Sequence, residues 1–443
     1  MRKTVFLPLL LCAALSPHVV AQARPGSRAS TSTVYKLVAV KAKGTSRYTD
    51  KEILAASGLQ LGQDASDGDF KEAAKHLGAS GLFSDVVYSF SYSGTGAQLE
   101  LHLTDLDKSK LLPARFENFV WFSDAELLDS LRHHVPLFKE LLPVTGRLQS
   151  EVSEALQAVL TEKALPGRVD FVLQGTQDEG DLTGVIYRVE GISTRIRNVE
   201  FPGASPEQVA FLTNAVHRIA GAEYLRSALA TVARYDMLPP FLQRGYLKAA
   251  FAPSEARVVV PSPADPDANN DIEVDAILPV TPGPQYLVSS VQWKGTSVVP
   301  SEEASRNFHL IPGQPADAIR LVQDVGTLTR LYHSRGYMTA DIKTDAQLDD
   351  QKSTVRYEMH VTEGELYKMG ELEILGLDSA SHDRLRDAWT LQEGQPYNAD
   401  YTKKFVDDAA RFLPRGAQYT VKIDEELAAK DKVVDLTIHF KMQ

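Results

Sequence analysis

The sequence of 443 residues is nearly free of cysteine, because Cys12 is the only one. Cys12 lies in an N-terminal segment that we expect to be removed on export, so the mature chain would hold no thiol. A chain without thiols excludes disulfides, cysteine-ligated zinc and thiol catalysis. Beyond its N-terminus the sequence also lacks any run of about 18 uninterrupted apolar residues. We therefore expect no transmembrane segment in the mature chain.

Basic residues are in the minority. Lys and Arg number 47 against 58 Asp and Glu, which gives a formal net charge of −11. No local cluster of basic residues offsets this acidity, and a phosphate backbone would repel such a chain, so we expect no nucleic-acid partner. Hydrophobic residues make up 43% of the chain and charged residues 24%, which is the balance of a folded globular protein.

The N-terminus has the pattern of a secretory signal peptide. A positively charged start precedes the apolar stretch from Val5 to Leu15, and small residues at positions 21 and 23 supply a cleavage site. We expect residues 1–23 to be removed, so that the exported protein begins at Arg24 with a linker over 24–33. The alternative is an uncleaved segment that anchors the chain in the inner membrane.

An internal repeat organises the rest of the chain. Alternating apolar residues, which indicate strands, end at a turn glycine four times. The first interval between these glycines is about twice as long as each of the other two. This indicates that the first interval contains one further repeat of about 80 residues whose turn glycine is missing. Asn118, a residue type that tolerates left-handed turns, is expected in its place. The turn glycines are Gly44, Gly203, Gly295 and Gly376.

Two helices are expected between this turn and a hairpin. Capping-box patterns predict the start of the first helix after Thr49, Ser123 and Ser205. A Gly-Gln step follows that helix in the first, fourth and fifth repeats, and the second helix ends at a glycine that is often followed by an aromatic residue. Two alternating runs then predict a hairpin, so each repeat reads β-α-α-β-β. Three of the helix-ending glycines are Gly81, Gly245 and Gly336.

This order resembles the POTRA (polypeptide-transport-associated) domain of outer-membrane protein assembly factors. The similarity is most specific at Gly336-Tyr337 and at Glu363-Gly364, and weakest in the second repeat, where His133 to Thr145 looks like an inserted loop. The resemblance implies an α+β fold of five tandem β-α-α-β-β domains in an elongated array. We expect these domains at 34–110, 111–192, 193–283 with a loop insertion at 262–271, 284–364 and 365–443.

The resemblance implies protein binding in the periplasm, near the inner face of the outer membrane. In the family such repeats usually precede a membrane β-barrel, and we expect this chain to be an array without one. The implied function is a non-enzymatic, chaperone-like scaffold. Its implied partners are an outer-membrane β-barrel protein or other envelope-assembly proteins, with unfolded outer-membrane proteins as clients. The alternatives are a structural adaptor in envelope or cell-division machinery, anchored by an uncleaved N-terminal helix, and a barrel-less fragment of an assembly factor.

In the family, the strand after the second helix is the edge that recruits extended clients by β-augmentation. In the first repeat this strand lacks Lys, Arg and Pro, which protect strand edges, so we expect it to bind clients best. The simpler interpretation is that its alternate apolar side chains are core residues. The strand comprises Val86, Val87, Tyr88, Ser89, Phe90, Ser91 and Tyr92, and the corresponding strands are predicted at 168–173, 247–251, 338–342 and 419–423.

The sequence shows no active-site pattern, and we expect no catalysis, cofactor or metal. It has no G-x-S-x-G, no P-loop and no G-x-G-x-x-G that opens a helix. His133 and His134 would point about 100° apart on a helix, without a supporting carboxylate, which favours solvated surface. The segment from Asp265 to Asp271 resembles half of a calcium loop, but it lacks the turn glycine and the bidentate glutamate, which favours a solvated loop.

An array of separate repeats predicts an elongated shape in solution. Each repeat would bury its own sheet under its own helices, and the connections between repeats are short. A compact globule of about 420 residues has a radius of gyration of roughly 22 Å. Small-angle X-ray scattering of the mature protein should give a clearly larger value, and a radius near that of the globule would contradict the repeat interpretation.

Overall fold

The computed structural model describes residues 34–94, 96–175, 182–259, 271–414 and 418–442. The predicted signal peptide, the linker, Cys12 and residues 262–270 of the third repeat's insertion therefore lie outside the described residues. Contacts divide the chain into two compact units. The first comprises the residues up to Leu112 with His134–Glu151, and the second comprises Pro113–His133 with the residues from Val152 onward.

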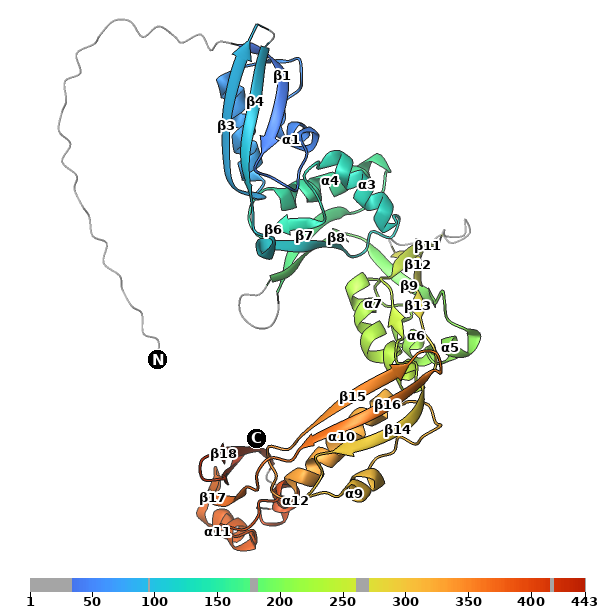
Figure 1. Ribbon diagram of the computed structural model, residues 1–443, viewed down its shortest axis with the longest axis vertical. Coiled ribbons are helices and arrows are strands. Elements are labelled where there is room, and N and C mark those ends of the chain that lie inside the picture. Colours follow the sequence, from blue (N-terminus) through green and yellow to red (C-terminus); the bar gives the residue numbers. More distant parts are fainter. Residues whose placement is uncertain (1–33, 95, 176–181, 260–270, 415–417, 443) are drawn as a thin grey trace, which may run out of the picture. The chain divides into compact units, whose positions relative to one another are not determined.

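The predicted order β-α-α-β-β recurs along the described chain (Figure 1). The first repeat comprises β1 (Tyr35–Lys43), α1 (Asp50–Ser57), β2 (Asp64–Ala65), α2 (Asp67–Ala79), β3 (Phe83–Ser93) and β4 (Gly96–Asp105). After the 3₁₀ turn η1 (Lys108–Lys110), the second comprises β5 (Leu111–Phe116), α3 (Asp124–His134), β6 (Leu141–Pro143), α4 (Leu148–Glu162), β7 (Arg168–Gly175) and β8 (Leu182–Glu190).

The third repeat is the most irregular of the remaining three. It comprises β9 (Ser193–Glu200), α5 (Pro206–Ala210), α6 (Thr213–Ile219), α7 (Arg226–Val232), η2 (Ala233–Met237), α8 (Leu238–Leu242), β10 (Ala250–Phe251), β11 (Glu255–Val258), β12 (Asp271–Ile277) and β13 (Val280–Thr281). The fourth comprises β14 (Leu287–Lys294), α9 (Ser301–Arg306), α10 (Ala318–His333), β15 (Asp341–Asp349) and β16 (Thr354–Thr362). The fifth comprises β17 (Lys368–Leu375), α11 (Ser379–Ala388), α12 (Ala399–Asp408), η3 (Ala409–Arg411), β18 (Tyr419–Ala428) and β19 (Val433–Met442).

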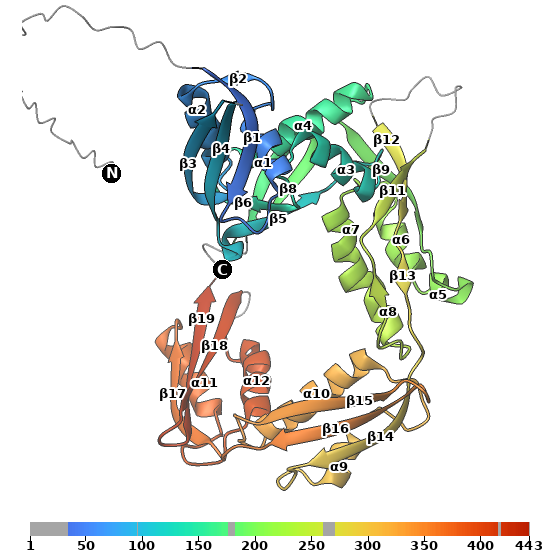
Figure 2. The same ribbon diagram turned by 45° about the horizontal axis from the view of Figure 1, so that its top comes forward.

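One strand order recurs in the sheets. A late strand of the repeat lies at the centre, parallel to the first strand and antiparallel to the strand that follows the second helix. Figure 2 shows this order in the first repeat, with β4 between β1 and β3. The described sheets contain the orders β1-β4-β3, β5-β8-β7, β9-β12-β11, β14-β16-β15 and β17-β19-β18.

The alternation of side chains along the central strand sets which face is covered by helices. In β4, Leu99 and Leu101 are buried, as are Phe70 and Leu77 of α2. The intervening Glu100 points to the open face of the sheet, because successive residues of a strand face opposite sides. One face of each such strand therefore builds the core, and the other remains polar.

The helix starts follow the predicted capping boxes. Thr49 and Glu52 form a reciprocal pair, in which the Thr49 N–H donates to the Glu52 carboxylate at 2.8 Å and the Glu52 N–H donates to Thr49 Oγ1 at 3.3 Å. Equivalent pairs form at Ser123 with Glu126 and at Ser205 with Gln208. These three predictions are confirmed.

The second helix of the third repeat departs from the predicted continuous helix. It is divided into α7, the π-helical turn η2 and α8. Pro239 and Pro240 follow the π-helical turn, and a proline has no N–H with which to continue the i→i−4 bonds. The Leu238 N–H instead donates to the Ala233 carbonyl, five residues earlier, where an α-helix would use the residue four positions earlier.

The turn after the first strand packs tightly against the segment that closes the same repeat. In four repeats the turn holds a glycine with positive φ, and a Cβ there would lie 1.9 to 2.4 Å from a backbone carbonyl oxygen. Only glycine fits such an approach without displacing backbone. The four pairs are Gly44 with Leu103, Gly203 with Val280, Gly295 with Val361 and Gly376 with Phe440.

The second repeat holds Asn118 at this place, where we predicted a left-handed turn residue. That prediction is wrong in its geometry, because the φ of Asn118 is not positive. Instead its side chain, which is 2% exposed, bonds to Val189 twice. The Val189 N–H donates to Asn118 Oδ1 at 2.8 Å, and Asn118 Nδ2 donates to the Val189 carbonyl at 2.9 Å. A side-chain amide thus makes the connection that elsewhere depends on close backbone packing.

The Gly-Gln steps connect the helical layer to the first strand. A bulge residue seven positions before the turn glycine exchanges two backbone hydrogen bonds with the step. Leu37 donates to the Gln63 carbonyl at 2.8 Å, and Gly62 donates to the Leu37 carbonyl at 2.7 Å. The same reciprocal pairs join Val288 to Gly313 and Gln314, Met369 to Gly394 and Gln395, and Ile196 to Gly221 and Ala222.

Two of the predicted post-helix strands begin later than we expected. We predicted strands at 247–251 and 338–342, but the residues directly after each helix-ending glycine form a turn. The Ala340 N–H donates to the Tyr337 carbonyl at 3.1 Å, and Ala249 bonds to Tyr246 in the same way. An i→i+3 bond closes a β-turn, so β15 begins only at Asp341 and β10 only at Ala250. β10 pairs with β13 and not with the central strand β12, so the predicted edge strand at 247–251 is wrong and the edge of this sheet is β11.

The predicted insertion in the second repeat packs on the first repeat. His134–Glu151 groups with the residues up to Leu112 in one compact unit. Lys139 from this segment lies 2.9 Å from the Glu52 carboxylate and 4.9 Å from the centre of the Tyr48 ring, and it donates to the Arg47 carbonyl. The insertion therefore contributes contacts that stabilise the segment between β1 and α1 of the first repeat.

Two glycines of the fourth repeat allow a test of the tight turn. Gly295 and Gly313 both have positive φ, but a Cβ on Gly295 would lie 2.2 Å from the Val361 carbonyl oxygen, whereas nothing lies within 4 Å of one on Gly313. Gly313→Ala should cost about 1–2 kcal/mol, the penalty of left-handed backbone alone. Gly295→Ala should cost about 1–3 kcal/mol more, as overpacking does.

Hydrogen exchange of the intact protein, read out over residues 286–364, measures the two local free energies of opening. A cost for Gly295→Ala no greater than that for Gly313→Ala would show that the close approach to Val361 does not constrain the fold.

Candidate peptide-binding edge

Strand β3 lies at the edge of its sheet. It pairs with β4 on one side, over the antiparallel register from Phe83–Asp105 to Ser93–Gly96, and has no strand on the other side in the described residues. Its backbone groups on that side are available to an added strand. On its outward face Val87 is 52% exposed, and at the end of the strand Tyr92, on the same face as Phe90, is 61% exposed and stacks on the Tyr35 ring with the ring centres 4.5 Å apart. The predicted edge residues 86–92 therefore all lie in one edge strand.

The alternate side chains of β3 contact helix α2. The ring centres of Phe90 and Phe70 lie 5.1 Å apart. The Tyr88 hydroxyl donates to the Asp67 carboxylate at 3.0 Å, and this hydrogen bond raises the pKa of Tyr88. Val86 is half-buried like its two neighbours on this face. The inward side chains are thus packing residues, as the simpler interpretation held, and only the backbone edge and the outward face remain open.

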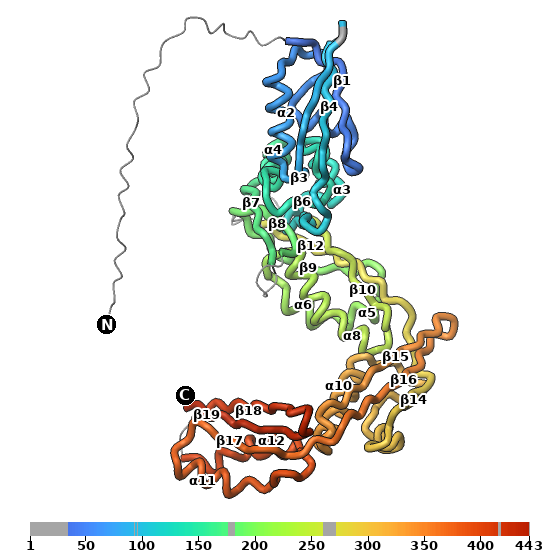
Figure 3. The backbone as a smooth tube through the Cα atoms, turned by 60° about the vertical axis from the view of Figure 1, so that its left-hand side comes forward, coloured from blue at the N-terminus to red at the C-terminus, as the bar shows by residue number. Residues whose placement is uncertain are grey.

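A groove of about 410 Å³ lies between α2 and the free edge of β3. Figure 3 shows the backbone of α2 alongside that of β3. Lys71, Ala74, Lys75 and Gly78 line the helical side, and this i, i+3, i+4, i+7 spacing places them on one face of the helix. The groove is open because two of these residues are small: a Cβ on Gly78 would meet only Val86 Cγ2, at 3.9 Å.

These helical residues were not predicted from the sequence. Their spacing follows directly from the 3.6-residue period, but a small residue on a helix usually indicates close packing with another element, not a groove. The helical side also carries two exposed cations, of which Lys75 lies 3.4 Å from the Glu72 carboxylate. An acidic or polar client side chain would be favoured beside them.

The other post-helix strands carry more charge. From Val86 to Ser93, β3 has eight consecutive uncharged residues, whereas β7 contains Arg168 and Asp170 and β15 contains four charged residues in nine. β18 contains one Lys, one Asp and two Glu. In the third repeat the edge is only the four residues of β11, after Pro253. Charged side chains and short length both protect an edge from pairing, so β3 is the least protected of these strands.

The predicted motif residues of the fourth repeat support the fold. Glu363 accepts hydrogen bonds from the N–H groups of Ser297 and Val298, at 2.7 and 2.8 Å, and from the Tyr332 hydroxyl at 3.0 Å. Partial burial acts to raise the pKa of Glu363, but these hydrogen bonds outweigh it and the pKa is lowered. Glu363 therefore ties the turn after β14 to the end of α10.

The helix-ending glycines contact the start of the next repeat. The Tyr367 N–H donates to the Gly336 carbonyl at 2.8 Å, and the Tyr286 N–H donates to the Gly245 carbonyl at 2.8 Å. A Cβ on either glycine would lie within 2.8 Å of the same tyrosine's carbonyl oxygen. Gly81 makes an equally close approach to Thr145, and Gly364 to Thr339. These residues, together with Tyr337, are structural and line no groove described above.

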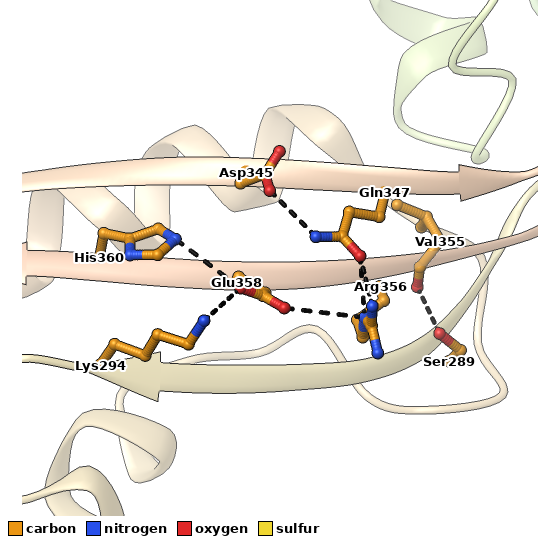
Figure 4. A network of polar contacts seen from close by, with 8 residues as sticks. All are labelled: Ser289, Lys294, Asp345, Gln347, Val355, Arg356, Glu358 and His360. Atoms are coloured by element: carbon orange, nitrogen blue, oxygen red, sulfur yellow. Dashed lines mark hydrogen bonds and ion pairs between the residues drawn. The ribbon is translucent and has the colours of Figure 1, made fainter.

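The open face of the fourth sheet is already paired within itself (Figure 4). Glu358 lies 2.6 Å from Lys294, 3.8 Å from His360 and 3.9 Å from Arg356, and the hydrogen bond from Lys294 lowers the pKa of Glu358. The first sheet repeats this arrangement, with Glu100 at 2.8 Å from both Lys43 and His102. The charged groups of these two clusters are therefore paired with one another.

The residues considered for metal binding do not gather into a site. His133 Nδ1 lies 2.8 Å from the Asp129 carbonyl oxygen on its own helix. In the part of the chain that the structure describes, no group of three or more His, Cys, Asp or Glu side chains is placed to hold a metal ion. The calcium-like segment lies almost entirely outside that part. Within the same described ranges, no helix has the length and apolar character needed to span a membrane.

Comparison with known proteins identifies the class. Residues 286–364 match the POTRA family model, described as a surface antigen variable number repeat. The match lies within the predicted fourth repeat, which contains Gly336-Tyr337 and Glu363-Gly364. The chain therefore contains a POTRA domain within an α+β fold, and the predicted resemblance is confirmed.

Solved structures of BamA, Omp85 and CdiB align with larger parts of the chain. POTRA domains 3–5 of BamA from Haemophilus influenzae align at 17% identity over 56% of this chain and 96% of that one, with a TM-score of 0.42. The N-terminal domain of Omp85 from Thermosynechococcus elongatus aligns at 16% identity over 56% and 97%, with a TM-score of 0.24. CdiB from Escherichia coli aligns at 14% identity over 53% of this chain and 35% of its own, with a TM-score of 0.20.

Proposed function

We propose that this protein is a non-enzymatic periplasmic scaffold that binds extended segments of outer-membrane proteins during their assembly or transport. The observation that carries the proposal is the β3 edge, with its uncharged strand and the groove beside it. The POTRA match and the assembly factors with which the chain aligns support the same process. An outer-membrane β-barrel protein would be the partner that receives the clients.

An extended client would join the sheet as a further strand beside β3. Its backbone N–H and C=O groups would pair with those on the free side of β3, which gives affinity that depends little on client sequence. Side chains on one face of the client would enter the groove above Ala74 and Gly78, and those on the other face would lie beside Val87. Client side chains can enter the groove because the small residues Ala74 and Gly78 leave it open.

The principal alternative is a structural adaptor in envelope or cell-division machinery. An adaptor would bind a folded partner through a fixed surface and would not distinguish unfolded clients. The two functions therefore differ in what the first repeat captures, and the same experiment separates them.

Filling the groove tests the proposal without breaking the edge strand. Gly78→Leu places a side chain above Val86, and replacing glycine in a helix should stabilise α2 by up to about 1 kcal/mol. We expect this variant to remain folded but to capture clients at least about fivefold less well. The measurement is photo-crosslinking from a probe at Ser89, with an outer-membrane β-barrel protein diluted from urea as the client.

Gly78→Ala is the matched control, because it gives the same helix stabilisation and adds only one methyl group to the groove. Its capture should remain close to that of the unmodified protein, and circular dichroism should show both variants folded. Equal capture by the two variants would contradict binding in this groove. Capture only of folded partners would favour the adaptor.

A further inference from the structure

A second groove, of about 790 Å³, runs along the first strand of the fifth repeat. One wall is β17, and the other includes Arg386 and Trp389 at the end of α11, with Leu391 beyond. This volume lies within the range of ligand-binding clefts. In the strand order β17-β19-β18 this edge lies opposite the post-helix strand (Figure 2), so the client edge proposed above does not account for it.

Part of the β17 backbone lacks a partner on the groove side. At its start, Met369 exchanges hydrogen bonds of 2.8 Å with Gln395 and Gly394. After the bulge that follows Met369, no strand pairs with β17 on this side in the described residues. The strand therefore presents a short free edge from Leu372 to Leu375.

The first repeat shows how such an edge can be closed. There the Ala42 N–H, two residues before the turn glycine, donates to Asp50 Oδ1 at 2.7 Å. Asp50 is the first residue of helix α1, and the first residue of the equivalent helix α11 is Ser379, which offers no carboxylate. Ile374 occupies the place of Ala42. In the described residues no side chain accepts a hydrogen bond from the Ile374 N–H.

The two sides of the β17 edge differ in chemistry. Glu371 and Glu373 are exposed on the open face of the sheet, and neither carboxylate forms an ion pair within the described part of the chain. On the helical side the groove is lined by the partly buried Leu372, Trp389 and Leu391. One row of carboxylates and one row of apolar groups thus flank a single backbone edge.

We propose that the β17 edge binds an extended segment of a partner polypeptide in which basic and apolar side chains alternate. Successive side chains of an added strand point to opposite faces. The basic row would lie beside Glu371 and Glu373, and the apolar row would lie on Trp389 and Leu391. On the helical side the exposed Arg386 and Glu393 carry opposite charges, whereas Glu371 and Glu373 on the open face carry the same charge, so a basic row is favoured on the open face.

Two labelled octapeptides test this proposal against the intact mature protein by fluorescence anisotropy. One repeats Lys-Val four times and the other repeats Glu-Val four times. We expect the Lys-Val peptide to bind at least about tenfold more tightly. Glu373→Lys should weaken its binding about tenfold, because attraction to an adjacent carboxylate becomes repulsion.

The matched control is Glu426→Lys in β18, which makes the same charge change at an exposed position on the other edge of the same sheet. It should leave the affinity within about twofold. Equal effects of the two substitutions would show that binding depends only on net charge, which would overturn the proposal. Absence of binding to the Lys-Val peptide would also overturn it.

A Lys-Val peptide with N-methyl groups on alternate residues tests the backbone pairing. It keeps the charges but loses the N–H donors of one edge, so binding should be lost, and undiminished binding would overturn strand addition. Gly78→Leu should not change the affinity of the Lys-Val peptide for this edge. The result is therefore independent of whether β3 binds clients.

Discussion

The close packing of the first-strand turn against the segment that closes the repeat is the constraint on which the rest of each repeat depends. It holds the two parallel strands together at one end, and the bulge residue with the Gly-Gln step holds the first strand to the helices at the other. With both ends held, the central strand is fully paired and the post-helix strand is left at the edge. The exposed edge of β3 is therefore a consequence of how the repeat is joined.

Much of this fold could be predicted from the sequence, because its signals are local. Capping boxes at Thr49, Ser123 and Ser205 and the turn glycines at fixed spacing determine helix starts and turns within a few residues. Asn118 shows the limit of such reasoning. Its position was predicted, but its role depends on two hydrogen bonds to Val189, which lies 71 residues further along the chain.

The candidate site was predicted only in part, for a physical reason. Alternation and the absence of charge indicate a strand edge, so residues 86–92 could be identified. The groove depends on how far α2 stands from β3, which is set by Ala74 and Gly78 and by the contact between Phe70 and Phe90. Such spacing between elements is a property of packing, which a one-dimensional pattern does not encode. The same holds for the β17 groove, whose apolar wall comes from α11 and the loop after it.

The central claim is that an unfolded client pairs with the free side of β3. Hydrogen exchange of the intact protein, with and without a saturating unfolded β-barrel client, tests it most directly. The account predicts that exchange over residues 84–92 slows at least about tenfold on binding, because previously free N–H groups become bonded, while residues 341–349 of the charged edge β15 change little. Client binding that leaves exchange over residues 84–92 unchanged would contradict the account.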